Sequence, residues 1–211
     1  MKLELKNLGR RFNKEWIFRG VDAVIDAHNP TVLFGHNGSG KSTLLKLISA
    51  SELPSEGEVI YSNEKGIISP EKVYQHIGMA APYMVLPEEY TLSELLNFNL
   101  KFKPFINQYT AEEIARKAYL EDALKKQIKV FSSGMKQRLK LALALFTEND
   151  LILLDEPTSN MDERGVNWYK SQIEEAVKGR TIIICSNAHI EEHFFCTQEI
   201  DINQYKHSKK Q

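Results

Sequence analysis

The sequence predicts an α/β protein with a mostly parallel core sheet, an antiparallel β piece and a helical subdomain. Two runs, residues 151–154 and 181–185, have the nearly unbroken apolar composition of strands buried on both faces of a parallel sheet. A helix-forming segment lies between them, which is the strand–helix–strand order of parallel sheets. A glycine-rich loop between a third apolar run and another helix-forming segment indicates a binding site on this sheet. We expect one domain over residues 1–211, with the helical subdomain at about 83–146.

The composition is that of an ordinary globular protein. Of its 211 residues, 42% are hydrophobic and 26% are charged. The formal net charge of −1 gives no general attraction to nucleic acid, so no nucleic-acid partner is expected. Two cysteines without C-x-x-C spacing predict neither a disulfide framework nor a cysteine metal site. The N-terminus lacks the apolar core of a signal peptide and no stretch is long enough to span a membrane, so we expect a cytoplasmic protein that reaches membranes only through a partner.

The first 70 residues are predicted to place antiparallel strands on either side of the glycine-rich loop. Apolar positions at 3–5 and 21–25 indicate short strands, and 57–61 with 67–68 indicate a hairpin around a turn at 62–66. The turn region between the first two strands is expected to contain Asn13, Lys14 and Gly20.

The glycine-rich loop fits the pattern G-x-x-x-x-G-K-[ST], whose glycines let backbone N–H groups point inward at phosphate oxygens. Lys41 adds a positive charge toward the β- and γ-phosphates, and Ser42 offers a hydroxyl to Mg²⁺. An apolar run at 31–34 precedes the loop and a helix-forming run at 43–48 follows it, so the phosphates would meet a helix N-terminus. The alternative interpretation is a glycine-rich turn that carries a surface lysine. Such a turn would not need a strand before it and a helix after it. The predicted nucleotide-binding residues of the loop are Gly35, His36, Asn37, Gly38, Ser39, Gly40, Lys41, Ser42 and Thr43.

The stretch 82–129 is predicted to be helical. Capping-box sequences at 91–94 and 110–113 each precede helix-forming residues, and Pro104 separates the two helices. The remaining predicted elements are a buried helix over 133–146, the strand 151–154, a helix over 166–177 with Gly179 near its C-terminal cap, and the strand 181–185.

Two further sites of chemistry accompany these elements. Asp155 and Glu156 follow a buried strand, where α/β sheets bind ligands; Asp155 is suited to Mg²⁺ and Glu156 to the water that attacks a γ-phosphate. Small residues at 132–134 open a helix and offer free N–H groups to a second anion. Taken alone, the acidic pair could be a solvated loop start and the small residues a simple helix cap.

Together these motifs resemble the nucleotide-binding subunit of an ATP-binding cassette (ABC) transporter, over nearly the whole chain. Residues 35–43 match the Walker A motif, 151–156 match Walker B, 131–135 occupy the place of the signature L-S-G-G-Q, and 159–162 match the D-loop. The resemblance implies a P-loop NTPase of the ABC type that binds and hydrolyses ATP. It also implies a homodimer or paired cassette formed on ATP binding, which drives an integral membrane permease at the inner face of the cell membrane.

The resemblance assigns roles to individual residues. Lys41 and Glu156 are implied to be catalytic, with Glu156 acting on the attacking water. Ser42 and Asp155 are implied to bind Mg²⁺. Besides the loop from 35 to 43, the residues implied to bind ATP are Phe12, Ser132, Ser133, Gly134 and Asn187. Phe12 would stack on adenine or else serve as a core or strand-end residue. Ser132, Ser133 and Gly134 would contact the ATP of the partner subunit.

Several positions depart from the family pattern. Where the family has a glutamine that senses Mg²⁺ and the transporter, this chain has Pro82, and the nearest upstream glutamine is Gln75. Asn187 stands in place of a histidine next to the γ-phosphate and cannot take a proton, while His189 lies two residues further on. The signature itself carries Ser133 and Met135 instead of glycine and glutamine. We expect hydrolysis to persist but to be slower or more dependent on a partner.

Three other functions are compatible with parts of the pattern. An ABC ATPase could act on a cytosolic scaffold rather than a permease, a module could hold ATP without turnover, or a small-molecule kinase could share the phosphate loop. The presence of Glu156 disfavours the second and the 132–134 motif disfavours the third. Apolar residues within 83–105, where related cassettes receive the permease, favour a transporter over plain packing beneath the helical subdomain.

Overall fold

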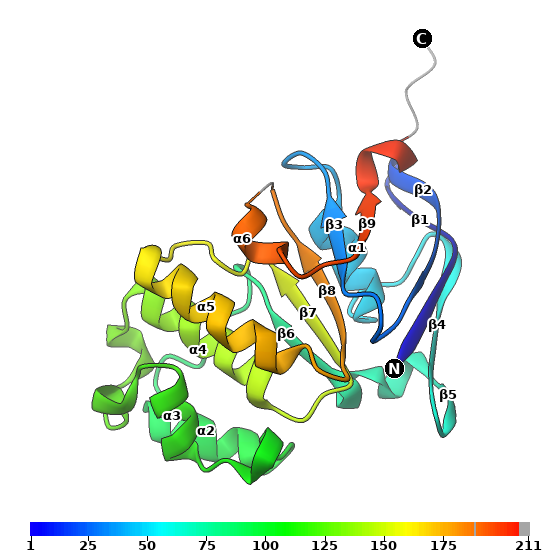
Figure 1. Cartoon of the computed structure of the whole chain (residues 1–211). Helices are drawn as coiled ribbons and strands as arrows, with labels where there is room; N and C mark the ends of the chain where they lie inside the picture. The colour runs from blue at the N-terminus through cyan, green and yellow to red at the C-terminus, as the bar shows by residue number, and fades with distance from the viewer. Residues whose placement is uncertain (188, 207–211) are drawn as a thin grey trace.

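The computed structural model describes residues 1–187 and 189–206 and contains two β-sheets flanked by helices (Figure 1). The larger sheet has five parallel strands in the order β6-β7-β8-β3-β9. These strands are β3 (Thr31–Phe34), β6 (Ile77–Ala80), β7 (Leu151–Asp155), β8 (Thr181–Cys185) and β9 (Gln198–Asp201). Every residue of β7 and β8 is buried, because helices cover one face of these strands and helix α1 with the second sheet covers the other.

The smaller sheet is antiparallel, in the order β2-β1-β4-β5. Its strands are β1 (Lys2–Phe12), β2 (Glu15–Ile25), β4 (Glu56–Asn63) and β5 (Gly66–Ile68). The prediction of two short strands here is wrong, because β1 and β2 each continue for 11 residues. Asn13 and Lys14 form the turn as expected, but Gly20 lies inside β2 with φ 75°. It lies between Val21 and Phe18, where the register with β1 shifts between Leu8 and Arg10, so it serves a bulge instead of a turn.

The helices confirm the predicted capping signals. The α-helices are α1 (Lys41–Ile48), α2 (Leu92–Leu100), α3 (Ala111–Lys117), α4 (Ser133–Phe146), α5 (Glu163–Ala176) and α6 (Ile190–His193). The 3₁₀ helices are η1 (Pro70–His76), η2 (Ile106–Gln108), η3 (Glu121–Ala123), η4 (Ile128–Val130) and η5 (Ile202–Tyr205). Both capping boxes form, with Thr91 and Glu94 at α2 and Thr110 and Glu113 at α3. Outside α2 and α3, however, residues 82–129 are turns and short 3₁₀ segments instead of the continuous helix-rich stretch that we predicted.

The parallel sheet separates two apolar clusters. Ile152 and Leu154 of β7 belong to a cluster with α2, α3, α4 and α5, whereas Leu151 and Leu153 belong to a cluster with α1 and the antiparallel sheet. Successive side chains of a strand point to opposite faces, which explains why this strand is apolar at every position before Asp155. The division into one domain with a helical subdomain at 83–146 stays a prediction.

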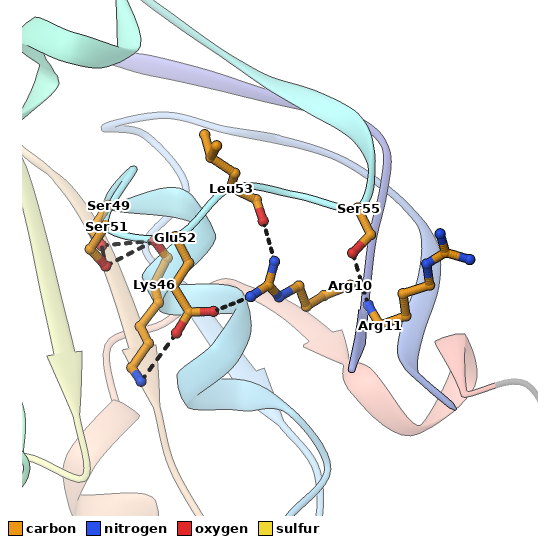
Figure 2. A network of polar contacts seen from close by, with 8 residues as sticks. All are labelled: Arg10, Arg11, Lys46, Ser49, Ser51, Glu52, Leu53 and Ser55. Atoms are coloured by element: carbon orange, nitrogen blue, oxygen red, sulfur yellow. Dashed lines mark hydrogen bonds and ion pairs between the residues drawn. The ribbon is translucent and has the colours of Figure 1, made fainter. Parts of the chain in front are cut away.

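A polar network ties the antiparallel sheet to the end of α1 (Figure 2). The Arg10 guanidinium on β1 pairs with the Glu52 carboxylate at 3.0 Å, and the Lys46 ammonium on α1 lies 3.4 Å from the same carboxylate. Arg10 also donates to the Leu53 carbonyl at 2.7 Å. The side chains of Arg10 and Glu52 are three-quarters or more buried, so the pair is desolvated enough to fix how the two elements sit. None of the helices among the described residues is long and apolar enough to cross a bilayer.

Candidate functional site

Three neighbouring parallel strands deliver polar residues to one edge of the sheet. In the register, Asp155 lies opposite Cys185, and Leu33 lies opposite Cys185 on its other side. The carboxyl ends of β3, β7 and β8 therefore meet, and the residues that follow them share this edge. These residues are the loop that begins at Gly35, Glu156 after β7, and Asn187 after β8.

The loop between β3 and α1 encloses a hollow of about 360 Å³, lined by Ile17, residues 37–43 and Glu156. Gly40 has φ 110°, a conformation that favours glycine, and a Cβ there would approach Cγ2 of Ile17 to 2.6 Å. Ile17 is a contact of this loop that the sequence did not predict. No side chain caps the start of α1, so its first N–H groups remain for a ligand. Ser39 lies in the same loop, and its buried hydroxyl has no hydrogen-bond partner in the described part of the chain.

Lys41, Asn187 and Glu156 form a continuous set of hydrogen bonds at the mouth of the hollow. The Lys41 ammonium is buried and donates to the carbonyls of Gly35 at 2.7 Å and His36 at 3.3 Å. It also donates to Oδ1 of Asn187 at 2.5 Å, and Nδ2 of Asn187 donates to Oε1 of Glu156. One carboxamide thus joins Lys41 and Glu156, the two residues predicted to be catalytic, although they lie far apart in the sequence. This set of bonds is called the carboxamide bridge below.

Ser42 and Asp155 form a second pair beside this bridge. Asp155 is 3% exposed, and the Ser42 hydroxyl and the Cys185 thiol hydrogen-bond to its carboxylate. The pKa of Asp155 is raised, mainly because the carboxyl group is buried and also because Glu156 carries a like charge. The hydrogen bond from Ser42 and the positive charge of Lys41 act in the opposite direction and lower this pKa. Hydroxyl and carboxylate oxygens are the donors that Mg²⁺ prefers. The described residues hold no group of three or more His, Cys, Asp or Glu side chains suited to a metal, so a metal here would need ligand oxygens as well.

Glu156 adopts a backbone conformation that is rare for a residue with a side chain. Its φ is 44°, in the left-handed region, and its N–H donates to the Cys185 carbonyl at 3.0 Å. Such a conformation costs about 1–3 kcal/mol and persists where the surroundings determine it. Here it turns the carboxylate away from β7 and toward the loop hollow, which Glu156 helps to line.

The predicted signature residues lie away from the loop of their own chain. Ser132 and Ser133 are exposed at the start of α4, where Ser132 Oγ accepts from the Met135 N–H at 3.2 Å and caps the helix. A Cβ on Gly134 would lie 3.5 Å from the Asn160 carbonyl, so the motif adjoins the predicted D-loop. In Figure 1 the start of α4 lies at the left of the molecule, well separated from α1.

Phe12 is also outside the loop hollow. It ends β1 with 57% of its surface exposed, and the Arg10 guanidinium lies 5.1 Å from its ring centroid. The exposed ring at the end of β1 offers a stacking surface.

The residues that depart from the family pattern have distinct positions. Gln75 belongs to η1, which precedes β6. It therefore lies at the amino ends of the parallel strands, at the opposite edge of the sheet from the phosphate loop. Gln75 is an exposed polar residue, as predicted. Pro82 is exposed after β6, at the carboxyl edge. His189 is exposed at the start of α6 and lines a hollow of about 310 Å³ together with Glu156 and Asn187.

Sequence reasoning missed Glu192. This carboxylate is 2% exposed and accepts from Ser186 Oγ at 2.6 Å, Thr158 Oγ1 at 2.7 Å and the Thr158 N–H at 3.0 Å. It thus joins the end of β8 to the segment that precedes Asn160. Glu192 follows another glutamate in a four-residue helix, and nothing in its neighbours distinguishes it from a solvent-facing side chain.

Comparisons with known proteins agree with this geometry. The family model described as "ABC transporter" matches residues 18–159. The "Uncharacterized ABC transporter ATP-binding protein YybJ" of Bacillus subtilis (strain 168) is 32% identical over 189 residues, which are 88% of this chain and 85% of that protein. YcbN of the same organism, with the same description, is 32% identical over 155 residues. These residues are 72% of this chain but only 50% of that protein. The dimeric post-hydrolysis structure of the ATP-binding cassette MJ0796 bound to ADP and Pi has a TM-score of 0.79 at 23% identity, over 94% of this chain and 93% of that one, which shows a shared fold.

Proposed function

This chain belongs to the ABC transporter ATP-binding family, and we propose that it hydrolyses ATP to drive a separate membrane permease. The observation that carries the proposal is the carboxamide bridge, which places Lys41 and Glu156 at one hollow beside the pair of Ser42 and Asp155. Phosphate-binding, metal-binding and water-activating groups are all needed for phosphoryl transfer to water, and all lie at this edge.

The residues present fit ATP with Mg²⁺. The N–H groups at the start of α1 and the Lys41 ammonium hold the phosphates, and Phe12 offers its exposed ring to the base. Ser42 and Asp155 hold Mg²⁺, for which their oxygen atoms are suited. When bound, Mg²⁺ neutralises charge on the β- and γ-phosphates.

Glu156 is the base of the proposed reaction. It accepts a proton from the attacking water as the water oxygen bonds to the γ-phosphorus. The bond from that phosphorus to the β–γ bridging oxygen breaks, and ADP and phosphate result. Asn187 orients Glu156 through its Nδ2 and can turn its amide toward the γ-phosphate once Lys41 engages the nucleotide.

A second cassette completes the site in this proposal. Ser132, Ser133 and Gly134 begin α4 with free N–H groups but do not reach the loop of their own chain. They are therefore placed to contact the γ-phosphate of ATP bound to another copy or to a paired cassette. The MJ0796 cassette, whose fold this chain shares, is described as dimeric, and this supports the pairing of two cassettes.

The permease contact is proposed for the exposed apolar surface that follows β6. The large apolar side chains exposed there are Tyr83, Met84, Val85, Tyr90, Phe98 and Phe102. Three of these rings contact one another edge to face, with centroids 5.9 Å apart for Tyr90 and Phe98 and 4.9 Å for Phe98 and Phe102. An exposed apolar surface of this kind supports a protein partner, and with a permease as that partner the chain would lie at the inner face of the membrane.

Two measurements test the proposal. The purified protein should release phosphate from ATP with Mg²⁺; a protein that binds ATP but releases none would be a binding module instead. In cells, the protein should sediment with membranes, and Val85→Glu should release it because that side chain is 89% exposed on the proposed contact. Ile67→Glu, at an 82% exposed position on β5, is the matched control. Recovery of the unaltered protein in the cytosol with a large complex would support the alternative, an ABC ATPase that acts on a cytosolic scaffold.

A further inference from the structure

The segment that follows β9 leaves the parallel sheet next to the phosphate loop. β3 and β9 are parallel neighbours, and Phe34, the last residue of β3, lies opposite Asp201, the last residue of β9. The loop from 35 to 43 and the 3₁₀ helix η5 therefore start from adjacent strands at the same edge of the sheet. This topology brings η5 to the nucleotide site, although none of the sequence motifs includes it.

The helix η5 is anchored to the body of the protein by its own residues. The Asp201 carboxylate caps it by accepting from the Asn203 N–H at 2.9 Å, and Ile202 is fully buried in the cluster beneath α1. Tyr205 packs against the same cluster. The Lys206 N–H donates to the Asn203 carbonyl at 3.3 Å. The backbone of Lys206 thus has a defined place, from which its side chain extends to the phosphate loop.

The Lys206 ammonium contacts the phosphate loop at two points. It lies 3.3 Å from Nε2 of His36 and donates to the Gly38 carbonyl at 3.4 Å. The other ring nitrogen of His36, Nδ1, lies 2.8 Å from the Asn37 carbonyl, which can only accept. This contact assigns the proton to Nδ1, so Nε2 of the neutral ring accepts from Lys206. Gly38 lines the loop hollow, so Lys206 acts on the wall of the phosphate site.

The carbonyls of a phosphate loop need hydrogen-bond donors from outside the ligand. The N–H groups of such a loop face the phosphates, so carbonyls point away and require other partners. Lys41 serves the carbonyls of Gly35 and His36, whereas Lys206 serves that of Gly38. When Lys41 turns to the phosphates in the proposed function, it gives up its carbonyl bonds. The contacts from Lys206 then remain to hold the loop.

We propose that Lys206 is a positioning residue of the phosphate loop, whose ammonium holds residues 36–38 in the conformation that binds phosphate. Its positive charge adds to the attraction that the loop exerts on the anion. The nucleotide site thus extends to a segment about 165 residues away in the sequence, supplied by the strand that pairs with β3. This inference rests on the proposed function.

The test compares Lys206→Met, which removes the charge and the donors, with Lys206→Arg, which keeps both. Lys65→Met is the matched control, because Lys65 is an exposed lysine in the turn between β4 and β5. All variants are made in a Glu156→Gln background so that ATP is not consumed. Binding with Mg²⁺ is measured by displacement of a fluorescent nucleotide with two competitors, ATP and tripolyphosphate, which has the phosphates but no base.

We expect Lys206→Met to weaken binding of ATP and of tripolyphosphate by the same factor, about three- to tenfold, the usual effect of one lost hydrogen bond. Lys206→Arg should restore both affinities, and Lys65→Met should match the parent. The melting temperature without ligand should be the same in all variants.

Several results would overturn the role of Lys206. These are unchanged binding in Lys206→Met, an equal loss in the control, no rescue by arginine, and a loss for ATP alone. A loss of binding that comes with a lower melting temperature would show a merely structural role and would also overturn it. If the parent binds neither ATP nor tripolyphosphate, the proposed function itself fails, which is a different result.

Discussion

At the residue scale, the carboxamide bridge sets the chemistry of the site. Asn187 accepts from Lys41 through oxygen and donates to Glu156 through nitrogen, so both ends of its amide are engaged before any ligand enters. An amide has no proton to exchange in the physiological range, whereas a histidine has. The site therefore positions its base with a group whose charge does not vary with pH.

We predict that Asn187→His raises the rate of phosphate release and makes it depend on pH. Imidazole titrates near pH 6.5, so the rate of the variant should change between about pH 6 and 8, whereas the parent should change less over this range. Steady-state phosphate release across that range is the measurement. No gain, or a loss, would mean that this residue is not the cause of slow turnover.

Glu156→Gln should leave ATP binding intact and lower phosphate release by roughly 10²- to 10⁴-fold, the usual contribution of a positioned base. Glutamine keeps an oxygen that can accept from Asn187, so the bridge is preserved. Lys41→Ala is the contrasting variant, because it removes the ammonium that holds the phosphates and should weaken binding itself. Hydrolysis by Glu156→Gln at the parental rate would remove Glu156 from the mechanism.

Asp155 gives a prediction about stability and pH. Burial and the charge of Glu156 raise its pKa in the folded state, so the unfolded state releases the proton at a lower pH. The ionised carboxylate therefore destabilises the fold above the raised pKa, and this cost disappears as the pH falls. Asp155→Asn should raise the melting temperature at pH 7, and the gain should shrink toward pH 4. A gain that is equal at both pH values would show another cause; binding of ATP with Mg²⁺ should be lost in either case.

At the element scale, β7 and β8 hold the site because they are buried on both faces. Leu153 of β7 is fully buried in the cluster beneath α1, only two residues before Asp155. The site residues thus follow directly on strands that the core packs on both faces, and these strands position the loops around them.

Leu153→Ala should lower the free energy of unfolding by roughly 2–5 kcal/mol, because it opens a cavity in a core that cannot collapse around it. Leu53→Ala is the same chemical change at a position that is 77% exposed, and it should cost less than about 0.5 kcal/mol. Urea unfolding followed by circular dichroism measures both. Equal effects at the two positions would contradict the arrangement of the core.

Local patterns predicted the elements whose causes are local. The strands β7 and β8, the two capping boxes and the phosphate loop each depend on a few adjacent residues. The lengths of β1 and β2 were not predictable in this way, because their continuity depends on a bulge in which Gly20 faces the shift between Leu8 and Arg10. Glu192 also escaped prediction, since its hydrogen bond to Thr158 joins residues that are far apart in the sequence.

At the scale of the whole molecule, the two parts of the proposed nucleotide site do not face each other within one chain. The phosphate loop opens at the carboxyl edge of the parallel sheet, and the start of α4 lies apart from it (Figure 1). Neither half can be completed within one chain, so assembly and catalysis are coupled in the proposed function.

Ser133→Glu should abolish ATP-dependent pairing while leaving ATP binding by the single chain unchanged. Ser133 is exposed, so the fold tolerates the change, but the added charge would repel the γ-phosphate of the partner's ATP. Size-exclusion chromatography with light scattering, in a Glu156→Gln background with ATP, measures the pairing. Ser171→Glu, on the exposed side of α5, is the control, and pairing by Ser133→Glu as strong as that of the control would argue against this contact.

The position of Glu192 has a consequence for how two such sites work together. One buried carboxylate accepts hydrogen bonds from Thr158, in the segment that leads to Asn160, and from Ser186, which directly precedes Asn187. The Tyr169 hydroxyl anchors the backbone of Glu192 as well, through its carbonyl at 2.7 Å. In the proposed pair of cassettes, loss of phosphate contacts at Asn187 would therefore reach the segment around Asn160 through Glu192, and a displacement of that segment by the partner would reach Asn187 by the same route. Turnover in one cassette and release of the other would then be linked by this one carboxylate.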